Sequence, residues 1–187
     1  MPSSRIMGGK AVTLHGMPWQ AGVAYKTGEM KDDVFCGGTI ICPRFVISAA
    51  RCQLEEGGKL IDKKDVIILT GATRLPPDGD FKRHEIKEIH IHPEWHVLGP
   101  PRTQFDVDLI IYELKGPIKF GISEKPVYLA DPNDPVKSDG VKFVTSGWGY
   151  IDEDNLPERL HAVQLPFVSR EHCKKKYAAI FDIVTKI

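Results

Sequence analysis

Residues 34–52 read VFCGGTIICPRFVISAARC, two short apolar runs separated by Cys42, Pro43 and Arg44. Apolar and β-branched residues in short runs are typical of strands, and a proline between them favours a turn. This segment therefore predicts a strand-turn-strand unit.

Further short runs of this kind recur along the chain. They lie at residues 66–69, 85–92, 108–114 and 142–146, and each is flanked by Gly, Pro, Asp or Asn. One helix is expected at residues 169–177, where Ser169 can cap the first turn, Glu171 follows and lysines come later. Many short strands with frequent turns predict an all-β barrel or sandwich.

Composition restricts the classes of partner. The 187 residues are 42% hydrophobic, enough for one sizeable core or two modest ones. Lys and Arg total 25 and Asp and Glu total 25, so no net charge attracts nucleic acid or anionic lipid. Because the chain has no apolar stretch of about 20 residues and its first residues lack the apolar core of a signal peptide, we expect no membrane span and no signal peptide.

The cysteines and histidines leave alternatives open. Four cysteines permit three full pairings, and composition does not fix the redox compartment. His90 and His92 lie two residues apart in an expected strand and so share a face, which suits either a metal pair or an exposed strand end. We favour the exposed strand end and predict no metal.

Residues 36–52 closely resemble the block CGGSLI…WVLTAAHC of the chymotrypsin/trypsin-like serine proteases. Other blocks resemble the same family in the same order. Residues 5–9 are similar to its activation junction, 105–114 to FDNDIALLKL, 144–149 to VTGWG, and 160–173 to LQEVQVPIVSREQC. The chain is identified as a member of this family, in the form of an inactivated and C-terminally truncated homologue.

The resemblance implies a trypsin-like double β-barrel whose second barrel is incomplete. Residues 6–113 would form the N-terminal barrel, and residues 114–187 a partial second barrel with one short helix. It also implies a disulfide between Cys36 and Cys52, and an activation cleavage between Arg5 and Ile6. The metal loop of some relatives would fall near residues 71–80, but Ala72 stands where a glutamate ligand is expected, so neither cofactor nor metal is predicted.

Two positions carry the implied catalytic chemistry. Asp108 matches the carboxylate of the Ser-His-Asp triad, and Arg51 stands at the position of the histidine. Imidazole accepts a proton near neutral pH, whereas guanidinium keeps its proton to about pH 12. Asp108 is then a vestigial carboxylate facing Arg51. The sequence also lacks the family's GDSGGP segment, so we expect the chain as written not to be an enzyme.

The leading functional hypothesis is a non-catalytic homologue that binds protease inhibitors or protein substrates. The alternative is a partial product of a gene for a secreted serine-type endopeptidase, with proteolysis implied by the family. An extracellular location follows from the resemblance and from the implied disulfide. An open second barrel would expose strand edges, so self-association is also expected.

Overall fold

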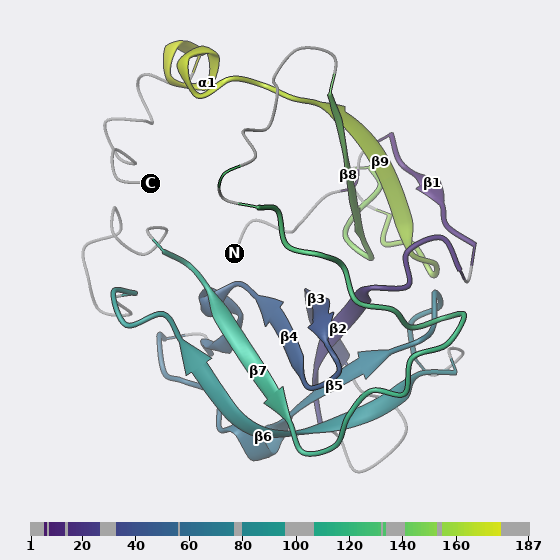
Figure 1. Ribbon diagram of the computed structural model, residues 1–187, viewed down its shortest axis with the longest axis vertical. Helices are drawn as coiled ribbons and strands as arrows, with labels where there is room; N and C mark the ends of the chain where they lie inside the picture. Colours follow the sequence, from purple (N-terminus) through teal and green to yellow (C-terminus); the bar gives the residue numbers. More distant parts are fainter. Residues whose placement is uncertain are drawn as a thin grey trace.

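The fold is all-β and has two parts, a closed six-stranded barrel and a three-stranded sheet (Figure 1). The structure is a computed structural model that describes residues 6, 8–13, 15–26, 33–55, 57–76, 80–95, 107–131, 133, 141–152 and 155–176. The predicted fold class, a double β-barrel with the second barrel incomplete, is confirmed. The predicted division into residues 6–113 and 114–187 stays a prediction.

The barrel strands are hydrogen-bonded in the order β2-β3-β4-β7-β6-β5, and β5 pairs with β2 to close the ring. In chain order they are β2 (Gln20–Tyr25), β3 (Asp33–Cys42), β4 (Phe45–Ser48), β5 (Val66–Thr70), β6 (Lys82–Ile91) and β7 (Ile110–Leu114). The predicted strands of this half are therefore present, with small shifts at their ends. Two short 3-10 turns, η1 (Ala50–Gln53) and η2 (Lys63–Asp65), were not predicted.

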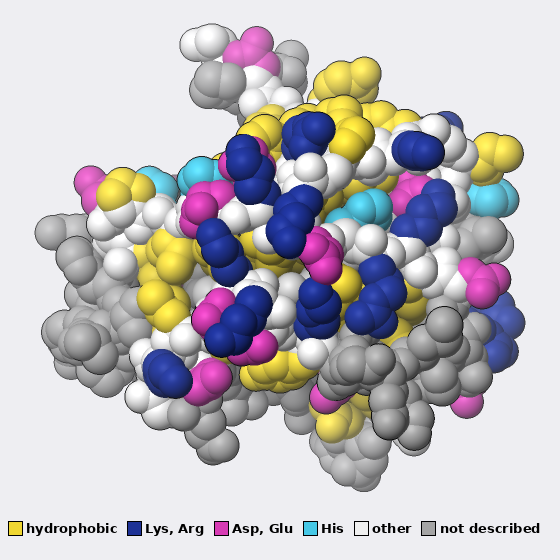
Figure 2. Space-filling model, turned by 90° about the horizontal axis from the view of Figure 1, so that it is seen from below, with side chains coloured by type: hydrophobic (Ala, Val, Ile, Leu, Met, Phe, Trp, Pro, Cys, Tyr) yellow, Lys and Arg dark blue, Asp and Glu magenta, His cyan; other side chains and the backbone are white. Residues whose placement is uncertain are grey.

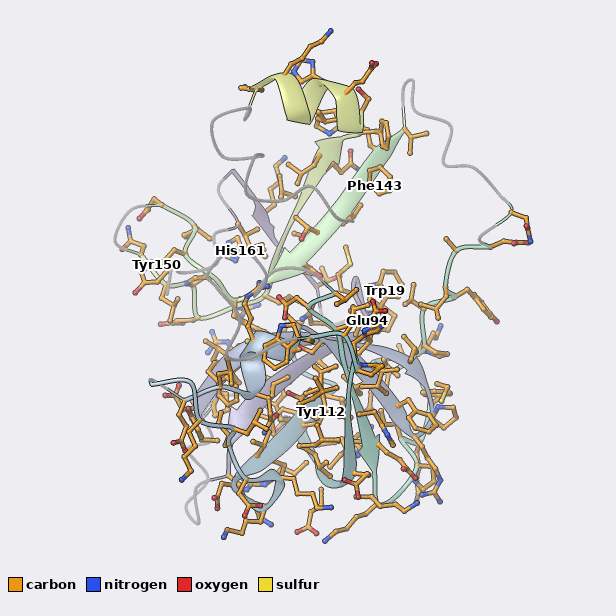
Figure 3. The ribbon with its side chains drawn as sticks, turned by 90° about the vertical axis from the view of Figure 1, so that its left-hand side faces the viewer. Trp19, Glu94, Tyr112, Phe143, Tyr150 and His161 are labelled. Atoms are coloured by element: carbon orange, nitrogen blue, oxygen red, sulfur yellow. A yellow bond between two sulfur atoms is a disulfide. The ribbon has the colours of Figure 1, made fainter. Side chains whose placement is uncertain are left out.

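The barrel core follows from the apolar pattern of these strands. Strand β5 is buried along its whole length, whereas β7 alternates buried and half-buried positions, as a strand with one inward face does. Ile40, Val46, Ile110 and Tyr112 belong to the central cluster and have no exposed surface. Figure 3 shows Tyr112 within the barrel. Each such side chain contributes about 1.5–3 kcal/mol by burial, so this core stabilises the barrel and the segments attached to its strands.

The outer face of the barrel carries paired charges. Figure 2 shows lysine and arginine side chains interspersed with acidic ones over this face. Glu85 lies 2.7 Å from the Lys115 ammonium and 2.8 Å from that of Lys26, and these two lysines lower its pKa to about 2. Exposed ion pairs contribute little stability each, so the barrel depends on its apolar core.

The second sheet has the strand order β1-β9-β8, with β1 (Lys10–Ala11), β8 (Lys142–Gly147) and β9 (His161–Pro166). The N-terminal strand β1 thus lies with this sheet and not in the barrel. Beyond β9, α1 (Arg170–Lys176) begins where the Ser169 hydroxyl accepts a hydrogen bond from the His172 amide, as predicted. In the described part of the chain, no helix is long and apolar enough to cross a membrane.

Part of the second sheet is apolar and exposed. Phe143 and Val144 on β8, Leu165 on β9 and the nearby Val168 are each 45–50% exposed. Figure 3 shows Phe143 on this sheet, away from the barrel. Large exposed apolar areas are uncommon on monomers. The predicted self-association through this sheet stays a prediction.

A buried acidic side chain anchors the segment that follows the barrel. Glu124 has no exposed surface, and its carboxylate accepts the Thr70 hydroxyl and pairs with the Lys82 ammonium. The Thr70 hydroxyl lies 2.8 Å from His84 Nε2, and because it donates its own proton to Glu124, the neutral imidazole must donate from Nε2. Burial lowers the pKa of His84; Glu124 opposes this effect and Lys82 adds to it.

Acid should destabilise the protein through His84. Its native pKa lies below that of the unfolded chain, so the unfolded state binds more protons once the pH falls below about 6.5. We expect the free energy of unfolding to decrease between about pH 7.5 and pH 5, by at most about 1.4 kcal/mol per pH unit for this one proton. Urea unfolding at a series of pH values measures the change.

The control is His84→Gln, whose amide can still donate to Thr70 but does not titrate. This variant should lose the part of the pH dependence that His84 supplies. If the unfolding free energy changed with pH by the same amount in the two proteins, His84 would not be the responsible group.

Candidate active site

Strand pairing brings Arg51 and Asp108 together across 57 residues of sequence. In the antiparallel pair of β4 and β7, Ser48 lies opposite Ile110. The turn η1 continues from β4, and Asp108 comes just before β7, so both residues lie at the same end of this pair. The two positions that the family resemblance singled out are therefore neighbours in the barrel.

Arg51 contacts Asp108 through its backbone and its side chain. The Arg51 amide donates to Asp108 Oδ1 at 2.8 Å, and its guanidinium Nη1 forms an ion pair with Oδ2. The Asp108 side chain is only 9% exposed, whereas that of Arg51 is 54% exposed. Because a guanidinium keeps its proton throughout the usual pH range, this is a permanent ion pair and not a proton-transfer pair.

The residue before Asp108 has an unusual backbone conformation. Val107 has φ +50°, which β-branched residues rarely adopt, and its carbonyl accepts a hydrogen bond from the Leu109 amide at 2.7 Å. Such a conformation costs on the order of 1–3 kcal/mol and persists only where surrounding contacts impose it. Val107 packs on the barrel core, and the Arg51 contact holds the next residue. The strain therefore lies directly beside the candidate site.

Buried contacts fix the turn that carries Arg51. Cys52 is joined to Cys36 by a disulfide, as the resemblance implied. The Gln53 side chain donates to the Ile61 carbonyl at 2.7 Å and accepts the buried Tyr112 hydroxyl at 3.0 Å. Burial raises the pKa of that hydroxyl. Sequence reasoning missed both polar residues, because a tyrosine in an apolar strand and a glutamine after a cysteine carry no distinctive pattern.

A recess of about 470 Å³ lies between the barrel and β8, with Asp108 in its wall. Its described lining is residues 19–20, 37–39, 47–49, 108–109 and 144–146, and we call this recess the cleft. Ser146 of β8 donates to Gln20 of β2 at 2.7 Å and so joins the two parts of the fold. Figure 3 shows Trp19 in this region, between the barrel and the second sheet. Among the described lining residues, Asp108 is the only charged one.

The N-terminal segment lies against the second sheet. Ile6 is 7% exposed, and its amide donates to the Tyr150 carbonyl at 2.7 Å. Together with Trp148, these residues line a second recess of about 440 Å³. Arg5 lies outside the described residues, so the predicted cleavage between Arg5 and Ile6 stays a prediction.

His90, on β6, and His92, just after this strand, have other partners. His90 Nε2 lies 3.5 Å from Glu113, and His92 Nδ1 accepts the Glu94 amide at 3.2 Å. In the part of the chain that the structure describes, no three His, Cys, Asp or Glu side chains are grouped as metal ligands would be. Cys42 is an unpaired thiol, and the side chain of Cys173 lies outside the description.

Comparison with known proteins identifies related chains. The family model described as Trypsin matches residues 6–186. Ovochymase of Halocynthia roretzi is 32% identical over 182 residues, which are 94% of this chain and 11% of that protein. Mannan-binding lectin serine protease 1 of Mus musculus is 28% identical over 193 residues, 98% of this chain and 26% of that protein. Vitellin-degrading protease of Bombyx mori is 24% identical over 184 residues, which are 98% of this chain and 63% of that protein. The chain therefore spans less than two thirds of each of these relatives.

These relatives overturn one sequence-based prediction. We expected the chain not to be an enzyme, but the proteins that it matches include named serine proteases. The expectation rested on Arg51 and on where the sequence stops. Arg51 excludes only residue 51 as a general base. The end of the sequence says nothing about the activity of the protein.

The Arg51–Asp108 pair should couple in a double-mutant cycle. Arg51→Ala removes the cation from the nearly buried Asp108 and leaves, among the described contacts, the backbone amide of residue 51, so we expect a loss of about 1–3 kcal/mol of unfolding free energy. The coupling energy between Arg51→Ala and Asp108→Ala should be about 0.5–3 kcal/mol. Asp108→Asn, which keeps an acceptor for the Arg51 amide, should cost less than Asp108→Ala. Additive effects of the two alanine substitutions would exclude a significant interaction.

The disulfide beside Arg51 should contribute strongly to stability. Its cysteines are 16 residues apart, and a loop of this size corresponds to about 3 kcal/mol. We expect the Cys36→Ala, Cys52→Ala double variant to unfold at correspondingly lower urea concentration. Cys42→Ala, which removes an unpaired thiol, is the control. A double variant no less stable than this control would contradict the expectation.

Proposed function

The chain belongs to the trypsin family of serine proteases, and on this basis we propose that it supplies the first barrel and the cleft of an extracellular serine-type endopeptidase. The observation that carries the proposal is the contact of residue 51 with Asp108 beside the cleft. These are the positions at which the family holds its general base and the carboxylate that orients it. The proposed substrate class is polypeptide.

The lining of the cleft suits an extended polypeptide. Gly37 is exposed and presents no side chain to the cleft, and Thr39 and Ser48 add small polar groups. The Ser48 hydroxyl donates to the Gly37 carbonyl at 2.7 Å and can still accept a hydrogen bond. The exposed Thr145 on β8 forms part of the opposite wall. Backbone and hydroxyl groups of this kind bind a peptide main chain through hydrogen bonds and place few demands on its side chains.

Arg51 has a defined role in this proposal. A general base must accept the proton of the attacking group, and a guanidinium does not do so near neutral pH. Arg51 therefore holds positive charge beside the cleft, next to the lining residue Asp108, and proton transfer falls to a group other than residue 51. Asp108 holds both the backbone and the side chain of Arg51.

The extracellular location rests on the disulfide. The bond between Cys36 and Cys52 closes the loop that carries Arg51. Disulfides persist in oxidising compartments and are rare in the cytosol. This chemistry supports the location that the family resemblance implied.

A second candidate function is the capture of a protease inhibitor or a protein substrate in the same cleft. The permanent charge of Arg51 favours this second function, because binding a ligand requires no general base at residue 51. The two candidates share the binding step and differ in whether the bound polypeptide is cleaved.

We expect the purified chain to bind fluorescein-labelled β-casein, an extended polypeptide, in an anisotropy titration. Thr145→Trp should weaken binding by about tenfold, because the indole fills the cleft beside β8. Lys142→Trp is the matched control: it puts the same indole on the same strand at an exposed position that does not line the cleft. Its affinity should stay within about twofold of the unmodified chain.

Gel electrophoresis of the same mixtures separates the two candidates. Casein fragments support the endopeptidase, and intact bound casein supports capture. Absence of casein binding, or equal binding by the two tryptophan variants, would overturn the proposed use of the cleft.

A further inference from the structure

Arg51 is held in place and yet half-exposed. Its amide and its Nη1 both donate to Asp108, and the next residue, Cys52, is tied to Cys36. These constraints fix the position of the guanidinium, but 54% of the side chain still faces solvent. An arginine held in this way loses little further freedom when it binds a ligand.

The exposed hydrogen-bonding groups of this pair are mainly the donors of Arg51. Both carboxylate oxygens of Asp108 already accept from Arg51. The guanidinium has five N–H groups, and Nη1 is its contact with Asp108. Among the described residues, the guanidinium contacts a carboxylate through Nη1 and not through Nε or Nη2. The Asp108 side chain is only 9% exposed, so a ligand reaches mainly the guanidinium and must bring acceptors.

The shape and charge of the free donors favour a carboxylate. Nε–H and one N–H of Nη2 lie in one plane and match the two oxygens of a carboxylate, whereas a peptide carbonyl offers one oxygen. The charge of Asp108, the only charged residue in the described lining of the cleft, is balanced by Arg51 itself. No other charged group of that lining competes for the guanidinium.

Arg51 does not itself line the cleft, but it is paired with Asp108, which does. We propose that Arg51 provides a carboxylate-binding site beside the cleft, so that the polypeptide ligand carries an acidic group next to Asp108. The acidic group is a Glu or Asp side chain or a C-terminal carboxylate. The inference rests on the proposed function, because it assumes that a polypeptide occupies the cleft. Asp108 acts as the positioning residue that aims the guanidinium.

The probes for the test are pools of acetylated, amidated, fluorescein-labelled hexapeptides in which one position is fixed as Glu or as Gln. At one position, the Glu pool should bind the chain about tenfold more tightly than the Gln pool. Arg51→Gln should reduce this preference to about twofold or less, and Arg51→Lys should retain part of it, because lysine keeps the charge without the planar pair of donors. A Gln pool with a free C-terminal carboxylate distinguishes the two sources of the acidic group.

The control variant is Lys64→Gln, which removes another exposed cation paired with a carboxylate, Asp62, at 3.2 Å. It should keep the full preference for Glu. Equal binding of the Glu, Gln and free-acid pools would overturn the role of Arg51 and leave polypeptide binding intact. A preference for acidic peptides that survives in both Arg51 variants would overturn it as well. Failure of every pool to bind would overturn the proposed function itself.

Discussion

The pairing of β4 with β7 is the constraint on which the rest of the site depends. It places the turn after Ser48 beside the segment before Ile110, and so brings Arg51 into contact with Asp108. The barrel core makes this pairing rigid, because Val46, Ile110 and Tyr112 on these strands are fully buried. A slip of one residue would reverse the two faces of a strand and separate the pair.

The side-chain contacts around the site reinforce this geometry. The disulfide and the hydrogen bonds of Gln53 fix η1 to the barrel. Asp108 fixes the Arg51 side chain through the ion pair. The result is a fixed positive charge, half-exposed to solvent, next to a recess lined by both polar and apolar residues. The family places a proton-transfer pair at these positions, whereas this chain has a permanent ion pair. On the proposed function, the same scaffold would bind a polypeptide with a changed role for residue 51.

Local patterns predicted much of the barrel, because its strands are short apolar runs between turn residues. The strand-turn-strand unit, the capped helix and the placement of Arg51 near Asp108 followed from the sequence and its family resemblance. Strand β1 could not be predicted, since Lys10–Ala11 has no apolar pattern and forms only by pairing with β9. The buried position of Glu124 could not be predicted from the sequence either. It lies in a proline-rich passage, and its partners Thr70 and Lys82 are 54 and 42 residues away.

The central claim is that Arg51 is a permanently charged donor, oriented by Asp108 and able to bind a carboxylate. Nitrogen-detected NMR of ¹⁵N-arginine-labelled protein tests it most directly, with Arg51 assigned by its absence in Arg51→Lys. The account predicts that the Arg51 guanidinium rotates slowly about its Cζ–Nη1 bond, and that its nitrogen resonances shift on addition of Glu peptides but not of Gln peptides. A freely rotating guanidinium, unchanged by Asp108→Asn and by both peptides, would contradict it.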